Sequence, residues 1–393
     1  MPYLIFIFSL IQPIYALVFA INESAKKKSG YLSLFCIALA FAAFAFAITP
    51  PVEYDLYRHY ERIDSLKELP LSKILEFEKP GYVLFDIYAW IISSLGLPKQ
   101  AFTFSIVLIA YLLILSIFND IKRNYLQNAS SIYIYISLIV IWLSIPFVGL
   151  SSGIRGSFAT ILAVYFSYNL ILYKKLIHFL IGALIAFLMH PFGIVAPIIV
   201  LLSYKFSWWS SKSKILIFIG LLLSISYKLV ELSVEFVLSF LSDLNFFKAV
   251  YFEKDGEFGS GFIDSQSLFG VIATVILPRT PLYLAQLYLI TLKTKSNDTM
   301  YLLLCFLCLF FGVFQSFYVI SGRISEFFIL IFSIYLILWQ SNSRTRFDRI
   351  FLWVYIFSLI SYSIARIYAT RFFLFDNLNI FFKPLLFILF DSP

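Results

Sequence analysis

Charged residues are scarce in this sequence. Asp, Glu, Lys and Arg together account for 13% of the 393 residues, whereas about a quarter of the residues in an ordinary soluble domain are charged. Hydrophobic residues account for 61% and aromatic residues for 20%. So little charge excludes a soluble globular protein, and lipid is the expected solvent for most of the chain.

Cysteine is also rare, and the motifs of several enzyme classes are missing. Cys36, Cys305 and Cys308 all fall within apolar segments, which indicates helix packing rather than a redox pair or a metal site. The sequence has no Asp-x-Asp pair, no glycine-rich phosphate loop and no local Ser/His/Asp arrangement. We therefore expect a metal-independent site that uses no cofactor.

Long apolar runs fill most of the sequence. A membrane-spanning helix needs about 20 apolar residues, so the chain has room for about ten to thirteen transmembrane helices. The segments expected to form them are residues 3–21, 31–49, 101–118, 130–148, 154–173, 176–190, 191–204, 215–236, 268–292, 299–319, 324–340 and 350–366, with a weaker one at 372–390. The sequence therefore predicts an all-α, polytopic membrane bundle that forms a single domain over residues 1–393.

The net charge of +8 does not indicate nucleic-acid binding, because the basic residues form short runs between apolar segments. These runs are at residues 26–28, 122–123, 174–175, 205–214, 293–295 and 344–349. Short basic connectors lie in the cytoplasm by the positive-inside rule. The connectors between them are then expected to face outward, and the longest are residues 50–80 and 243–267.

An odd number of crossings must separate the outward loop 50–80 from the cytoplasmic Lys122. Two apolar stretches, 81–96 and 101–118, lie between them, so one of the two should not cross. Segment 81–96 is the shorter and carries Asp86, and we expect it to re-enter the membrane from outside and return. Such a half-crossing backbone persists only where protein or a water-filled cavity satisfies it, which predicts an outward-facing cavity.

Ionisable residues at membrane depth are costly and are therefore the first candidates for function. Arg155 follows the Gly/Ser-rich turn 149–153 and opens an apolar helix. Its guanidinium fork suits a phosphate or pyrophosphate, and the alternative is an arginine that reaches the lipid headgroups. His190 precedes Pro191 at a helix break, where it is a candidate general base, a hydrogen-bond donor to phosphate or a packing residue.

Two more arginines are candidates, Arg323 at the outer start of one apolar segment and Arg279 within another. Arg323 follows Gly322, and Glu326 comes one turn later, so Arg323 either binds substrate or forms an intrahelical ion pair. Arg279 lies between two prolines near membrane depth, which makes it a candidate substrate ligand.

The early outer loop mixes acids with tyrosines. Asp55 is a candidate catalytic carboxylate, and Tyr57, Arg58 and Tyr60 follow it closely. Tyrosines stack on sugars and carboxylates bind hydroxyls, so the loop is a candidate carbohydrate-binding surface. The alternative is an aromatic belt at the membrane interface.

Five short motifs follow one another along residues 50–330: the Asp/Tyr-rich loop 54–60, Glu78-Lys79-Pro80-Gly81-Tyr82, Gly153-Ile154-Arg155, His190 and Gly322-Arg323-Ile324. Together they resemble the EpsG-like branch of the Wzy-type bacterial polysaccharide polymerases. Two positions depart from that pattern, because Gly156 stands where the branch usually has Gln and Lys79 interrupts the usual Glu-Pro step.

The resemblance implies a polysaccharide polymerase in the bacterial inner membrane, with its active site facing the periplasm or the cell exterior. Its substrates would be a growing glycan on polyprenyl pyrophosphate and a lipid-linked repeat unit, for O-antigen, capsule or exopolysaccharide. Membrane lipid, a chain-length regulator and a flippase of the same pathway are the implied partners. Arg155, His190 and Asp55 would be catalytic, and the substrate-binding residues would be Arg323, Arg279, Arg58, Tyr57 and Tyr60.

Two alternatives remain open from the sequence. An O-antigen ligase-like glycan transferase would share the chemistry, although ligases usually keep their large outer loop late in the chain. A lipid-linked oligosaccharide flippase or another transporter should line both halves with polar groups. We find no internal repeat in the sequence, which disfavours many secondary transporters.

Overall fold

The computed structural model describes residues 1–27, 30–50, 54–67, 69–77, 82–226, 276–292, 298–315, 317–342 and 345–369, with the single residues 52 and 272. Several expectations lie outside the described residues. These are the outer loop 243–267, the segment 372–390, most of residues 268–276, the basic run 293–295 and the motif residues 78–81. The described part is helical and contains no strand, which confirms the all-α membrane bundle.

Four helices are long and apolar enough to cross a membrane, by length and composition. They are α7 (Gln100–Asn124), α10 (Ile154–Tyr173), α19 (Tyr318–Asn342) and α20 (Arg346–Ala369). Eight shorter apolar helices accompany them in the described chain: α1 (Pro2–Ile11), α3 (Tyr31–Phe46), α6 (Val83–Ser94), α8 (Ser131–Ser144), α11 (Leu176–Met189), α12 (Phe192–Lys205), α13 (Lys214–Ile225) and α18 (Thr299–Phe314). The remaining helices are α2 (Pro13–Ser24), α4 (Asp55–Leu66), α5 (Leu71–Phe77), α9 (Phe147–Ser151), α17 (Leu277–Thr291) and the 3-10 helix η2 (Ser207–Lys212).

The first apolar segment differs from the single span expected at residues 3–21. The backbone leaves the helical conformation at Gln12, with φ −141° and ψ 87°, and α2 starts at Pro13. Proline lacks the N–H that would continue the helical hydrogen bonds, so it suits a helix start and not an interior. The two short helices pack against each other and against α3.

The break expected at His190 is present. His190 is extended, with φ −164° and ψ 138°, and it separates α11 from α12. The α10 helix also matches its expected range of 154–173, and it ends at Lys174 in the left-handed conformation, with φ 57°. By contrast, α19 begins at Tyr318 rather than near residue 324. A glycine inside a helix, such as Gly322, lowers the stability of the helix by only about 1 kcal/mol and does not end it.

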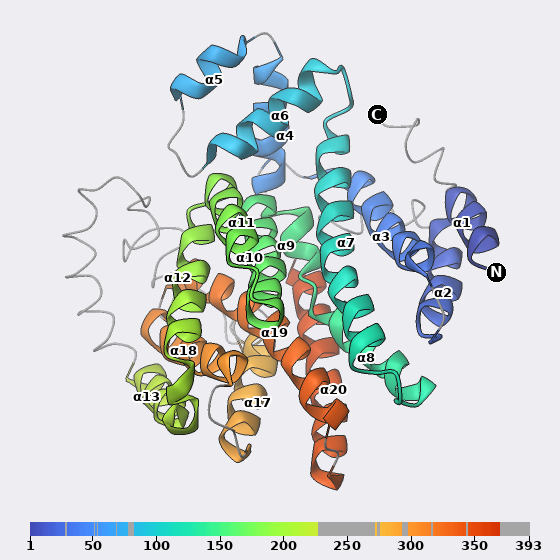
Figure 1. Ribbon diagram of the computed structural model, residues 1–393. Helices are drawn as coiled ribbons and strands as arrows, with labels where there is room; N and C mark the ends of the chain where they lie inside the picture. Colours follow the sequence, from blue (N-terminus) through green and yellow to red (C-terminus); the bar gives the residue numbers. More distant parts are fainter. Residues whose placement is uncertain are drawn as a thin grey trace.

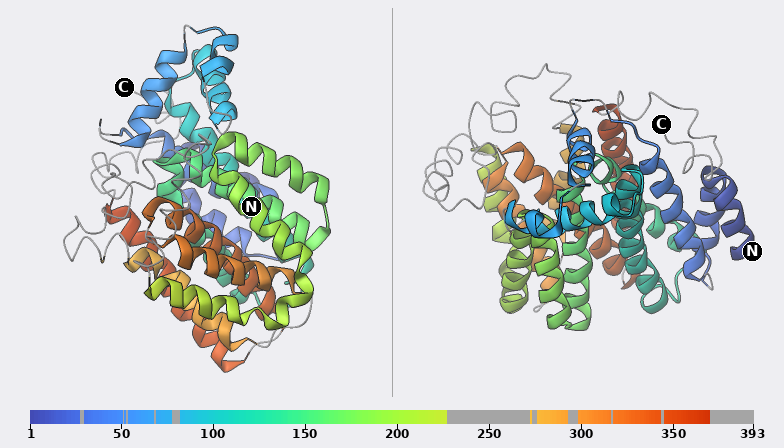
Figure 2. Two further views of the ribbon diagram at one scale, coloured as in Figure 1. Left: turned by 90° about the vertical axis from the view of Figure 1, so that its left-hand side faces the viewer. Right: turned by 90° about the horizontal axis from the view of Figure 1, so that it is seen from above.

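Helices α4, α5 and α6 lie together at one end of the bundle (Figures 1 and 2). Helix α6 has 12 residues, a length of about 18 Å, which is too short to cross a hydrocarbon core of about 30 Å. Its buried Asp86 is held by Arg62 of α4, whose Nε and Nη2 donate to the carboxylate at 2.7 and 3.1 Å. We call these three helices the α4–α6 cap, and the two-pronged ion pair between Arg62 and Asp86 joins α4 to α6.

Helices α10 and α11 both have one end under this cap. Arg155, near the start of α10, contacts the ring of Tyr82, and His190, just after α11, contacts the same ring. The 20 residues of α10 extend about 30 Å, so the basic pair Lys174-Lys175 lies at the opposite end of the bundle. The α4–α6 cap and this basic connector are thus on opposite sides.

Close helix packing elsewhere uses glycine. Gly220 of α13 and Gly312 of α18 bring the two backbones together, because a Cβ at either position would overlap backbone atoms of the other helix. Small residues at such crossings allow the dense packing that stabilises helices in a membrane.

Candidate functional site

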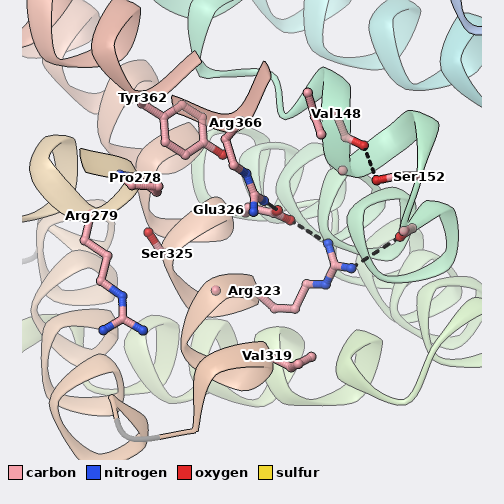
Figure 3. A pocket seen from close by; sticks show the side chains of 13 residues that line it. Val148, Ser152, Pro278, Arg279, Val319, Arg323, Ser325, Glu326, Tyr362 and Arg366 are labelled. Atoms are coloured by element: carbon pink, nitrogen blue, oxygen red, sulfur yellow. Dashed lines mark hydrogen bonds and ion pairs between the residues drawn. The ribbon is translucent and has the colours of Figure 1, made fainter. Parts of the chain in front are cut away.

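A cavity of about 270 Å³ lies where four helical segments meet. Its walls come from the α9–α10 junction, the first turn of α17, the first turns of α19 and the last turns of α20 (Figure 3). The lining residues are Val148, Gly149, Ser152, Gly153, Pro278, Arg279, Val319, Gly322, Arg323, Ser325, Glu326, Tyr362 and Arg366. Three guanidinium groups and one carboxylate among them give the lining a net charge of +2.

Glu326 organises two of these arginines. Its side chain is 3% exposed, and its two oxygens accept from Arg323 Nη1 at 2.9 Å and from Arg366 Nη2 at 2.5 Å (Figure 3). Ser157 of α10 donates to the same carboxylate at 3.1 Å. The intrahelical ion pair anticipated between Arg323 and Glu326 is thus present, and Arg366 extends it to α20.

Glycine at position 156 makes room for Arg323. A Cβ at Gly156 would lie 2.5 Å from Arg323 Nε and 2.7 Å from its Cζ. The same guanidinium donates through Nη2 to the carbonyl oxygen of Gly153 at 3.3 Å and through Nη1 to Ser157. The structure thus explains why glycine stands at position 156 in place of Gln, because Arg323 occupies the space that a side chain there would need.

Arg279 supplies positive charge from another direction. It is 5% exposed, and its Nη2 donates to Ser321 Oγ at 2.8 Å and to the carbonyl oxygen of Gln315 at 3.4 Å. The guanidinium lies 5.5 Å from the ring centroid of Phe311 and is turned away from Glu326 (Figure 3). Arg279 therefore belongs to the cavity wall without joining the Glu326 network.

Arg155 lies on the same turn of α10 as Gly156, but its side chain faces a different cluster. Its guanidinium is 4.6 Å from the ring centroid of Tyr82 and 5.3 Å from that of Phe85. Among the described residues, no hydrogen bond occupies its N–H groups. The two rings hold the plane of the guanidinium and leave its edge available to a ligand.

Asp55 and His59 complete this second cluster. His59 Nε2 is 3.2 Å from Asp55 Oδ2, and the side chains are 5% and 42% exposed, respectively. Burial lowers the pKa of His59, and Asp55 only partly opposes that effect. Burial alone would raise the pKa of Asp55, but His59, Arg155 and Arg58 outweigh it and hold that pKa well below its usual range.

His190 reaches the cluster through Tyr82, at a ring-centroid distance of 5.7 Å. The backbone N–H of Phe192 donates to His190 Nδ1 at 3.1 Å. A neutral imidazole that accepts at Nδ1 carries its proton on Nε2. In this arrangement His190 can donate a hydrogen bond to a ligand, but it has no free lone pair with which to take a proton.

The other expected loop residues are placed differently. Tyr60 is 3% exposed and packs in the core, where its hydroxyl is 2.9 Å from Thr103 Oγ1. Arg58 is exposed and Tyr57 is half-buried. The structure therefore gathers Arg155, His190 and Asp55 in one cluster, and gathers Arg323 and Arg279 in the cavity.

Arg366 and Ser157 belong to the cavity network although they are not among the residues predicted from the sequence. Arg366 carried a usable signal, because it is an arginine at the end of an apolar helix, as Arg323 is. The contacts of Ser157 with Glu326 join segments 169 residues apart, and no local pattern indicates such a pairing.

Comparison with known proteins identifies a family. The sequence model of the EpsG family matches residues 32–379, which includes both clusters. No curated protein and no solved structure matches the chain. Because the match extends over most of the chain, the protein belongs to the EpsG family, the family of Wzy-like polysaccharide polymerases.

Proposed function

We propose that this chain transfers a growing polyprenyl-pyrophosphate-linked glycan onto a lipid-linked repeat unit. The transfer occurs on the outer face of the bacterial inner membrane, in the synthesis of O-antigen, capsule or exopolysaccharide. The observation that carries the proposal is the cavity in which Arg279, Arg323 and Arg366 outnumber the single carboxylate of Glu326. A pyrophosphate between a lipid and a sugar is an anion that such a site suits.

The position of the cavity supports a lipid-linked substrate. Three of its wall helices, α10, α19 and α20, are long and apolar enough to cross a membrane, and its α9–α10 wall lies at the end that carries the α4–α6 cap. The basic pair Lys174-Lys175 lies at the opposite end, and short basic connectors favour the cytoplasm. The cavity then opens toward the outside, where a polyprenyl chain in the bilayer can place its pyrophosphate.

The chemistry follows from the arrangement. The acceptor hydroxyl oxygen attacks the anomeric carbon of the donor, and the bond from that carbon to the pyrophosphate oxygen breaks. The leaving pyrophosphate gains negative charge, which Arg323 and Arg366 stabilise from fixed positions. Glu326 holds both guanidiniums before the substrate arrives, so little reorganisation is needed in the transition state.

Arg366 gives the sharpest test, in cells whose own copy of the gene is deleted. We expect Arg366→Ala to lower the polymerisation rate roughly 10²–10³-fold, the cost of losing one preorganised donor to a developing anion. Arg366→Lys should recover only part of that loss, because lysine lacks the two-pronged fork. The matched control is Arg349→Ala, an exposed arginine near the start of the same helix.

The surface glycan of the deletion strain separates the competing functions. A polymerase mutant shows a single repeat unit on a gel, a ligase mutant shows no glycan attached to the final acceptor, and a flippase mutant shows none exported. Single repeats in the deletion strain and in Arg366→Ala, at normal protein abundance, support the proposal. An unchanged ladder for Arg366→Ala would remove the cavity from the site.

A further inference from the structure

Transfer to a hydroxyl releases a proton, and the carboxyl and imidazole groups near the two clusters are those of Glu326, His190, Asp86, Asp55 and His59. Asp86 is buried and is held by two hydrogen bonds from Arg62. Glu326 is engaged by three donors on Arg323, Arg366 and Ser157. His190 already accepts at Nδ1 from a backbone N–H. Asp55 and His59 remain, in contact with each other at 3.2 Å.

We propose that Asp55 and His59 act as one proton-accepting pair for the acceptor sugar hydroxyl, at a site distinct from the arginine cavity. This inference rests on the polymerase function proposed above. Asp55 is the catalytic residue that the hydroxyl reaches, because its side chain is 42% exposed, whereas His59 is almost completely buried behind it. His59 is a positioning residue, whose Nε2 faces Asp55 Oδ2 at 3.2 Å.

The surroundings fix the geometry of the pair. The ring of His59 is 5.0 Å from that of Phe85, and Phe85 also supports the guanidinium of Arg155. Arg155 therefore lies next to the pair with its donors free among the described residues, where they can bind hydroxyl groups of a sugar. These residues come from α4, α6 and α10, so the site forms where the α4–α6 cap contacts α10.

The charges around the pair suit proton acceptance. Burial lowers the pKa of His59, and the nearby positive charge of Arg155 lowers it further. The negative charges of Asp55 and Asp86 raise this pKa, but the net effect is a lowered pKa. Asp55 is held ionised by His59, Arg155 and Arg58 against the effect of burial, so its pKa is lowered too. The ionised carboxylate of Asp55 can therefore accept the proton of the hydroxyl, and neutral His59 beside it fixes the position of the carboxylate, as the partner does in other oriented acid–base pairs.

The reaction step balances across the two clusters. The O–H bond of the acceptor breaks as its oxygen bonds to the anomeric carbon, and the proton passes to the carboxylate of Asp55. The carbon–oxygen bond to the pyrophosphate breaks with its electron pair on the leaving group in the cavity. One turn of α10 joins the two places, because Gly153 and Gly156 contact Arg323 while Arg155 contacts the cap.

The test uses membranes that contain each variant, and lipid-linked repeat units extracted from cells that lack the protein. Asp55→Asn should lower the rate of ladder formation roughly 10²–10⁴-fold at equal protein abundance. Asp55→Glu should keep more activity than Asp55→Asn, since it keeps a carboxylate. The matched control is Asp64→Asn, because Asp64 lies on the same helix, is 63% exposed and pairs with Lys99.

The pH profile gives a readout that a purely structural role would not move. Activity of the parent should fall as the pH drops through the pKa of Asp55, which is held below the ordinary carboxyl range. His59→Gln should lower the rate and move this limb upward toward the carboxyl range near pH 4, because His59 helps to hold the pKa of Asp55 down. His178→Ala, at an exposed histidine of α11, should leave the limb in place. An unmoved limb in His59→Gln, or more activity in Asp55→Asn than in Asp55→Glu, would overturn the proposal.

The two proposals fail in different ways. If Arg366→Ala lowers the rate while Asp55→Asn and His59→Gln both match the parent, the proton-accepting pair is wrong and the cavity stands. If Arg366→Ala also matches the parent, the proposed function of the cavity is wrong.

Discussion

Replacing Gly156 with alanine should disable the cavity with a single methyl group. The new Cβ would lie 2.5 Å from Arg323 Nε and 2.7 Å from Cζ, whereas carbon atoms pack at about 3.5–4.0 Å. Arg323 must therefore retreat by about 1 Å. Its hydrogen bonds to Glu326 at 2.9 Å and to the Gly153 carbonyl at 3.3 Å would then exceed ordinary lengths. A 1 Å misplacement can cost about 10²-fold in rate, which is the loss we expect.

The assay is the rate of ladder formation in isolated membranes, with protein abundance measured on the same samples. The control is Gly30→Ala, because a Cβ at Gly30 would meet nothing within 4 Å. Gly156→Ala should also add little to Arg323→Ala, since both changes act on one guanidinium and such effects are not additive. A parental rate for Gly156→Ala at normal abundance would refute the claim that the position of Arg323 controls turnover.

Three further predictions concern the fold and its orientation. Arg62→Ala should lower the yield of folded protein, because Asp86 is left as a buried unpaired carboxylate. The double variant with Asp86→Ala should recover part of that yield. Thermal unfolding of the solubilised protein measures the stability of both variants. Gly312→Leu should separate α18 from α13 and reduce membrane abundance on an immunoblot. A cysteine at Lys67 should react with an impermeant reagent in intact cells, and reaction only after the inner face is opened would contradict an outward cap.

Much of the helical layout follows from the sequence, because apolar length and helix breakers are local signals. The range of α10 and the break at His190 are predictable for that reason. The single span expected at residues 3–21 is wrong in detail, because a second helix starts at Pro13. The apolar run continues through both helices, so hydropathy does not mark the break between them.

The site was predictable in composition but not in its grouping. Arg155, Arg323 and Arg279 are found by asking which charges lie at membrane depth. The division into a cavity around Glu326 and a separate cluster at Asp55 depends on contacts between distant segments, such as Glu326 with Arg366. The protonation pattern at His190 depends on one backbone hydrogen bond, which no sequence motif specifies.

The most direct test of the central claim is a structure of the protein with a lipid-linked repeat unit bound. The account predicts that pyrophosphate oxygens lie within about 3 Å of guanidinium nitrogens of Arg323 and Arg366. It also predicts that the sugar extends from there toward Asp55. A pyrophosphate bound at Arg155, with the Glu326 network intact and the cavity empty, would contradict it.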